Sequence, residues 1–400
     1  MEALDMQMLL KRNYKCFPAI ELLAQGKKID EAQIVELLEY IDGRYDGADF
    51  RMIPIIRTLY AYSSLISPMM IERIEQTVLG FKYWMDEPGD DSMCYWTESH
   101  QLIFATIEFL AGQYYPDKVF TNNNMGGIGR IIHSKKRILN WLKYRYQFGF
   151  VEWKANSNYE EIIAALSLLN DFCEDEEIQA KATILMDLIL FDLAVNHYHG
   201  YFAATSGNIQ EEHLLNPNMQ GTLNIMKKAF DIGPIIDYDY TSLSAEFILN
   251  SKYNIPEVIK QIANSEDSFI LKESMGLDLQ EVSKKIDSQN RLETTGLYYW
   301  SMGAFTNAES VKLTTQMLKD WNLITNNYLE GLYKKSPKKA LSSISNNFEQ
   351  IKSGIAIEKA NTYSYRHPHY FLSTVQCYQP NNLGLDQNIT LATLGQDITV

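Results

Sequence analysis

The sequence is poor in cysteine and has no long apolar run, and both absences narrow the possible functions. Its four cysteines, at positions 16, 94, 173 and 377, lie far apart and form no C-x-x-C pair. This spacing excludes a zinc finger and predicts isolated thiols, which fit a reducing compartment. No stretch reaches the roughly 18 apolar residues that a membrane helix needs, and no signal-peptide pattern is present. We expect a soluble chain without membrane insertion, whose localisation stays open.

Positive charge is also scarce. The chain has 36 Lys and Arg against 50 Asp and Glu, which gives a formal net charge of −14. Such a protein repels phosphate backbones, so we expect no nucleic-acid partner. The Gly-rich segment 126–129 lacks the Lys and the Ser or Thr of a phosphate-binding loop. Two H-x-H pairs, at 197/199 and 367/369, have no evident third ligand, and the acidic segment 86–91 is typical of a solvated loop. We therefore predict no cofactor and no metal.

Helical periodicity is the strongest signal that the sequence contains. Hydrophobic residues make up 46% of the chain, enough for a sizeable core. The helices at 98–113 and 176–196 are apolar on most sides, so we expect both to be buried. Caps and spacing predict long helices over residues 30–43, 51–65, 69–84, 98–113, 130–147, 159–172 and 176–196, and shorter ones near 220–230, 242–250, 255–264, 277–286 and 308–322.

The pattern changes near residue 361, where tyrosines and β-branched residues predict extended or β segments. We divide the chain into a helical domain, residues 1–360, and the start of a β-rich segment or domain, residues 361–400. Helix pairs recur without a repeat of fixed period. This favours a mainly α fold in which antiparallel helical hairpins form an (α/α) toroid. We also expect a loop or short helix at 336–350, and a natural chain that continues beyond residue 400.

Short connections make successive helices antiparallel, which places residues 85–100, 148–159 and 197–219 at one end of the array. These stretches carry the carboxylate, imidazole and aromatic side chains that a glycan-processing cleft needs, although loops are often polar for solvation alone. We therefore expect a polysaccharide or oligosaccharide partner, while the oligomeric state stays open. The catalytic candidates are His100, Tyr201, Glu98 and Glu152, and the substrate-binding candidates are Trp96, Trp153, Asn156, Tyr159, Tyr198 and His199.

Two of these assignments have a simple alternative. His100 lies in the first turn of a buried helix, where the positive end of the helix dipole disfavours protonation and predicts a neutral imidazole that can act as a base. The alternative is a histidine hydrogen-bonded within a helix interface. Glu98 and Glu152 are predicted to form an acid/base pair for hydrolysis. The alternative for Glu98 is that it stabilises the N-terminus of its own helix.

Three groups of segments carry a resemblance to a family of large, uncharacterised microbial proteins. They are residues 96–102 with 110–117, residues 149–153 with Tyr159, and residues 368–374 with 387 and 392–395. The family is similar in design to heparinase II/III-like and chondroitin/alginate lyases, which join an α/α toroid to a β-sandwich. The resemblance implies β-elimination on a uronate-containing glycan, in which Asn neutralises the uronate carboxylate, His or Tyr removes the C5 proton and Tyr protonates the leaving oxygen.

On this chain, His100 matches the histidine of those lyases and Tyr201 or Tyr198 matches the tyrosine. Ser99 stands where the lyases have the asparagine next to the histidine, and Asn156 is the candidate to take its place. The leading prediction is thus a polysaccharide lyase-like enzyme. The alternatives are a glycoside hydrolase that uses Glu98 and Glu152, and a non-catalytic glycan-binding or assembly module. Two carboxylates across the cleft would favour hydrolysis, and a cleft plugged by side chains would favour the binding module.

Overall fold

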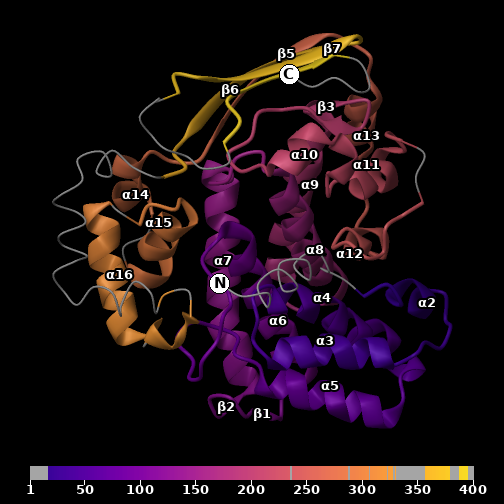
Figure 1. Cartoon of the computed structure of the whole chain (residues 1–400), viewed down its shortest axis with the longest axis vertical. Coiled ribbons are helices and arrows are strands. Elements are labelled where there is room, and N and C mark those ends of the chain that lie inside the picture. The colour runs from indigo at the N-terminus through magenta and orange to yellow at the C-terminus, as the bar shows by residue number, and fades with distance from the viewer. Residues whose placement is uncertain are drawn as a thin grey trace, which may run out of the picture.

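The computed structural model is mostly helical, with small antiparallel sheets (Figure 1). This confirms the predicted mainly α class with β segments near the C-terminus. Among the helices that the structure describes, none has both the length and the apolar character to cross a lipid bilayer. The described residues are 17–234, 237–286, 289–305, 307–321, 323–327, 329, 356–378 and 387–394, so the segment predicted at 336–350 lies outside them.

Most predicted helices are present within a few residues of their expected bounds. The structure adds the short helices α2, α10 and α15 and the strand β5, which the sequence pattern did not predict. The helices are α2 (Ile20–Ala24), α3 (Ala32–Asp42), α4 (Ala48–Arg57), α5 (Pro68–Gly80), α6 (Glu98–Tyr114), α7 (Gly127–Phe148), α8 (Asn156–Phe172), α9 (Glu176–Val195), α10 (Glu211–Leu215), α11 (Leu223–Phe230), α12 (Ala245–Ile248), α13 (Glu257–Asn264), α14 (Leu279–Lys285), α15 (Leu297–Ser301) and α16 (Ala308–Asp320).

Alternate helices form two layers. Helices α4, α6 and α8 pack on one another, and α12 follows against α8. Helices α7, α9 and α13 contact one another in the same order outside this layer. Helix α6 contacts α4, α7 and α8, as its apolar circumference predicted. Figure 1 shows α14, α15 and α16 as a separate group on the other side of α7.

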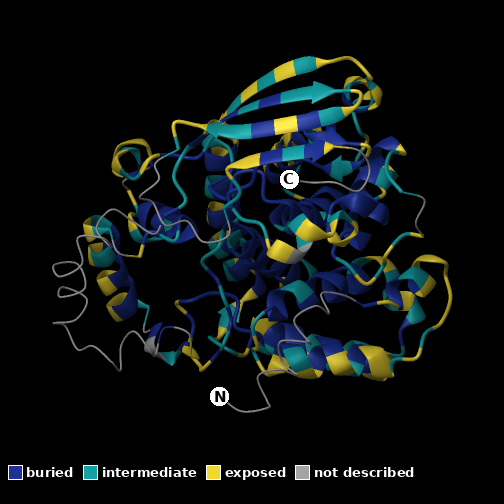
Figure 2. Ribbon diagram, turned by 45° about the horizontal axis from the view of Figure 1, so that its top comes forward, coloured by how far each residue is buried: buried dark blue, intermediate teal, exposed yellow. Residues whose placement is uncertain are grey.

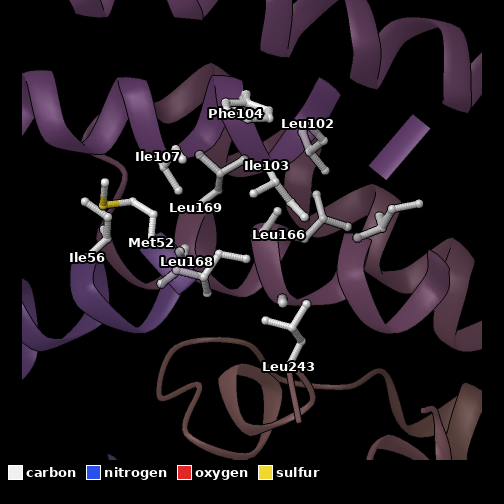
Figure 3. Packing of buried hydrophobic residues seen from close by; sticks show 14 of the residues in the cluster. Met52, Ile56, Leu102, Ile103, Phe104, Ile107, Leu166, Leu168, Leu169 and Leu243 are labelled. Carbon is white, nitrogen blue, oxygen red and sulfur yellow. The ribbon is translucent and has the colours of Figure 1, made fainter. Parts of the chain in front are cut away.

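Much of the core lies among the helices of the first layer, α4, α6 and α8. Figure 3 shows side chains of α4, α6 and α8 in close packing, with Leu243 closing one side. Ile103 and Leu166 are fully buried there. Since isolated helices of this length are marginal in water, burial of these faces provides most of their stability.

Buried charges in this core are paired. Arg57 at the end of α4 forms ion pairs with Asp171 of α8, at 2.9 Å, and with Glu246 of α12. Arg130 of α7 pairs in the same way with Glu87 and Glu108. A buried charge without a partner is strongly destabilising, so these pairs fix how the helices sit against one another.

A four-stranded antiparallel sheet covers one end of the helices in the order β5 (Phe269–Met275), β6 (Ala360–His367), β7 (Tyr370–Gln376) and β8 (Thr390–Leu394). Its strands alternate between buried and exposed residues, so one face packs inward (Figure 2). On that side, Arg366 donates to the backbone oxygens of Ala263 and Ser265 at the end of α13. Because β5 comes from within residues 1–360, the sheet crosses the predicted domain boundary, and that division stays a prediction.

The fully buried Ile103 of α6 provides a test of this packing. Ile103→Ala is expected to lower the free energy of unfolding by about 2–5 kcal/mol, because the lost atoms leave a cavity between three helices. Ile132 on α7 is 69% exposed and gives a matched control, for which the same substitution is expected to change stability by less than about 0.5 kcal/mol. Urea denaturation measures both, and equal effects would contradict the assigned packing of α6.

Candidate functional site

An open cavity of about 830 Å³ lies at one end of the helices. It is the end at which the alternating direction of successive helices predicted the candidate residues. Each of the three predicted stretches, 85–100, 148–159 and 197–219, contributes to its wall. Further wall residues come from 46–50, 160–161 and 220–242. The cavity begins where α4, α6 and α8 begin, so three helix N-termini meet there, each with a partial positive charge of about half a unit.

Carboxylates surround these helix ends. The described residues that line the cavity include five acidic side chains and no Lys or Arg. The acidic residues in the first turns of these helices are Asp49 of α4 and Glu98 of α6, which are both buried and are not among the described wall residues. The acidic residues in the wall are Asp46, Glu152, Glu160, Glu161 and Asp239.

His100 lies in the cavity wall and is held by Asp49. Its Nδ1 is 2.6 Å from the Asp49 carboxylate, and its ring stacks on Phe50 at 4.7 Å between centroids. Burial by itself would lower the pKa of the imidazole, but the charge and the hydrogen bond of Asp49 outweigh burial and raise the pKa of His100 to about 9. The raised pKa of His100 disagrees with the neutral imidazole that the helix dipole predicted, because the Asp49 carboxylate outweighs burial.

Glu152 is the acidic side chain of the cavity with the clearest acid/base character. It is buried, and its two oxygens accept hydrogen bonds from the side-chain amides of Asn158 and Asn208. Burial first, and then the negative charge of Glu98, raise the pKa of Glu152 to about 7. A carboxyl group with this pKa holds a proton at mildly acidic pH and releases it near neutrality.

Glu98 is not among the described residues that line the cavity. It lies in the protein interior, where it forms an ion pair with Arg145 of α7. Its carboxylate also accepts hydrogen bonds from the backbone N–H groups of Val151, at 2.9 Å, and Glu152, at 3.1 Å. The structure therefore brings Glu98 next to Glu152, but it does not place both carboxylates across an open cleft.

Among the described wall residues, Trp96 and Phe50 present large aromatic rings to the cavity, and both are half-buried. Two other aromatic candidates do not. Trp153 is buried under the segment that contains Gly207, where a Cβ atom would lie 2.9 Å from the indole ring. Tyr159 is also buried, and its hydroxyl donates to Asp192 of α9. These two rings therefore belong to the core and offer no face to a sugar.

The remaining candidates also lie outside the cavity wall. The side chain of Asn156 is buried and donates to Thr222. Tyr198 is buried in the short hairpin β3 (His197–Tyr198) and β4 (Tyr201–Phe202), while His199 is exposed at its turn. The hydroxyl of Tyr201 donates to Asn218 at 3.0 Å, which places the ring beside a smaller pocket next to the cavity. These residues lie in the predicted stretches of sequence, but their position in the sequence did not determine whether their side chains point into the cavity.

Several wall residues were missed by the sequence reasoning. The loop before α4 contributes Asp46. Successive helices alternate in direction, so counting back from α6 through α5 to α4 places this loop at the same end. Glu160 and Glu161 follow Tyr159 on α8. Because each residue turns by about 100° around a helix, Tyr159 points to the core while its two neighbours line the cavity. No comparable sequence signal indicates Asn208.

Comparisons with known protein families, curated proteins and solved structures gave no match for this chain. The resemblance to polysaccharide lyases therefore stays a prediction, and a functional assignment depends on the geometry of the cavity. In the part of the chain that the structure describes, no group of three or more His, Cys, Asp and Glu side chains is placed to hold a metal ion.

The raised pKa of His100 predicts a pH-dependent stability. A histidine pKa raised from 6.5 to about 9 stabilises the folded protein fully below about pH 6.5, and this contribution is lost as the pH rises through about 9. We expect the free energy of unfolding to fall across this window, and Asp49→Asn to reduce the fall by about 3 kcal/mol. Urea denaturation near both ends of the window measures the difference.

Asp86→Asn is the matched control for this measurement. Asp86 is a partner of His133, whose pKa burial would lower but the hydrogen bonds of Asp86 and Glu108 raise to about 9. This substitution should change the contribution of His133 to the free energy of unfolding and leave the contribution of His100 unchanged. A fall of equal size in the wild type and in Asp49→Asn would contradict the assigned His100–Asp49 pair.

Proposed function

We propose that this chain is a carbohydrate-active enzyme that binds an oligosaccharide in the cavity and hydrolyses a glycosidic bond, with Glu152 as the general acid. The observation that supports this most directly is a buried carboxyl group with a pKa of about 7 in the wall of a large, open, polar cavity. Glycosidases raise the pKa of one carboxyl group by burial so that it can protonate the leaving oxygen.

A second carboxylate is needed to activate water or to attack the sugar. The same wall provides Glu161 of α8, whose charge contributes to the raised pKa of Glu152 and of His100. We assign this second role to Glu161. Protonated His100 then supplies a positive charge next to the two carboxylates, where it can orient hydroxyl groups of the substrate.

The cavity wall also suits a neutral sugar. Trp96 and Phe50 present apolar rings, which stack on the C–H face of a sugar, and Asn158 and Asn208 present amides beside the proposed acid. A volume of about 830 Å³ is typical of a site for a small ligand, and this open space favours a working site over a plugged cleft.

Three observations weigh against β-elimination on a uronate. The raised pKa of His100 favours the protonated imidazole near neutral pH, which disfavours its acceptance of the C5 proton. Tyr201 is not among the described residues of the cavity wall. The acidic wall, without Lys or Arg among its described residues, disfavours a polyanionic chain. The lyase reaction remains the competing proposal, and product analysis distinguishes it from hydrolysis.

We also propose that the helices form an open α/α toroid. The successive contacts of α4, α6 and α8, and of α7, α9 and α13 outside them, support this arrangement. The cavity then lies at the mouth of the inner layer, where connecting segments can change without disturbing the core. This is the position in which many helical and α/β folds hold their binding residues.

The first test is a turnover assay of the purified chain on neutral and acidic oligosaccharides. We expect new reducing ends without the absorbance of unsaturated uronates. Glu152→Gln should lower the rate at least about 100-fold, because the leaving oxygen loses its proton donor. Glu266→Gln changes an exposed glutamate outside the cavity wall and should leave the rate unchanged. Unsaturated products that depend on His100 would instead establish the lyase reaction.

The pH dependence of kcat/KM gives a second, independent prediction. Because Glu152 must be protonated to act as the acid, the rate is expected to fall as the pH rises through about 7. A rate that stays constant from about pH 6 to pH 9 would exclude Glu152 from this role. The profile is best measured on a substrate with a poor leaving group, since a good leaving group needs no proton.

A further inference from the structure

We propose that Glu98 is a positioning residue for Glu152, which holds the backbone of Glu152 by a hydrogen bond and keeps a fixed negative charge behind its side chain. Glu98 is not among the described residues of the cavity wall, and we assign it no part in the bond cleavage itself. The catalytic consequence of this inference rests on the proposed function. The structural and electrostatic part can be measured without any substrate.

The geometry joins three elements at one carboxylate. Glu98 is the first residue of α6, and Arg145 lies in the last turn of α7. Between them, the loop after α7 turns back so that the N–H groups of Val151 and Glu152 both donate to Glu98. The backbone oxygen of Glu98 in turn accepts from the indole N–H of Trp141, at 2.8 Å. Glu98 therefore holds the backbone N–H of Glu152 from the interior side, while Asn158 and Asn208 of the cavity wall hold its side chain.

Glu98 is completely buried, and burial raises its pKa above the ordinary value, although the ion pair with Arg145 and the two N–H donors limit that rise. All three donors stabilise the ionised form, and a protonated Glu98 would leave the Arg145 guanidinium without its counter-charge. We therefore expect this paired carboxylate to carry its negative charge, on the interior side of Glu152, over the pH range in which Glu152 loses its proton.

Several groups act on the proton of Glu152 from different elements. Helix α6 contributes Glu98 and His100, and α8 contributes Glu161 and the amide of Asn158. The loop after β4 contributes the amide of Asn208, and Arg145 of α7 faces Glu98. Burial has the largest effect on Glu152, and the charge of Glu98 is next, ahead of Asn208, Glu161 and His100. Glu98 is therefore the side chain with the greatest influence on when Glu152 loses its proton.

The experiment is a titration of Glu152 followed by carboxyl carbon NMR, with its signal assigned from Glu152→Gln. In Glu98→Gln, which keeps the shape of the side chain and removes its charge, we expect Glu152 to titrate at least about one pH unit lower than in the wild type. If the enzyme hydrolyses a substrate, the alkaline limb of its pH–rate profile should move by the same amount. An unchanged titration of Glu152 would overturn the inference.

Glu108→Gln is the matched control. Glu108 lies on the same helix, is equally buried and is paired with Arg130 and Arg137. Its loss should destabilise the fold through the same kind of broken ion pair, without moving the titration of Glu152 or the pH–rate profile. A shift of similar size in this variant would mean that Glu98 acts through stability alone, which also overturns the inference.

A wild-type measurement keeps the inference testable if Glu98→Gln does not fold. In the folded wild type, the carboxyl carbon of Glu98 is expected to show the ionised form throughout the pH range in which Glu152 titrates. A protonated Glu98 in that range would contradict the expected charge. Absence of hydrolysis on every substrate would count against the proposed function and not against this inference, because the titration is read without turnover.

Discussion

Helix α6 is apolar on almost every side, and the rest of the fold depends on covering it. Burial of a helix all round requires neighbours on each face, and α4, α7 and α8 provide them. Because short connections alternate the direction of the chain, this packing brings the N-termini of α4, α6 and α8 to one end. The cavity, its helix dipoles and its carboxylates all lie where that end opens.

Charges inside the helical core restrict the packing further. Arg57, Arg130 and Arg145 are almost completely buried, and each contacts at least one carboxylate. Such pairs contribute little net stability, but each is strongly destabilising when one partner is missing. They therefore select one arrangement of the helices over others that would bury the same apolar area. Part of the acidic composition of the chain serves these interior pairs, and the remainder is available to the cavity and the surface.

His100 and His133 show how a histidine beside carboxylates takes different roles in two parts of the structure. His133 lies at the surface of α7 beside Asp86 and Glu108, away from the wall of the cavity as it is described. His100 faces the cavity with Asp49 behind it and Phe50 against its ring. Both imidazoles have raised pKa values. His100 is the candidate functional histidine because it faces the cavity, whereas His133 is structural. Their charge states do not distinguish them.

The amino-acid sequence by itself determined the long helices, because hydrophobic periodicity and capping are local properties. It also determined that three particular stretches share one end, because the direction of successive short-linked helices alternates. It could not determine the strand β5, whose partner β6 lies about 90 residues away in the chain. Nor could it decide which polar residues face the cavity. Trp96, His100 and Glu152 do so, whereas Trp153, Tyr159 and Glu98 point into the interior. Side-chain direction depends on helix rotation and on contacts between distant segments, which form only when the chain is packed.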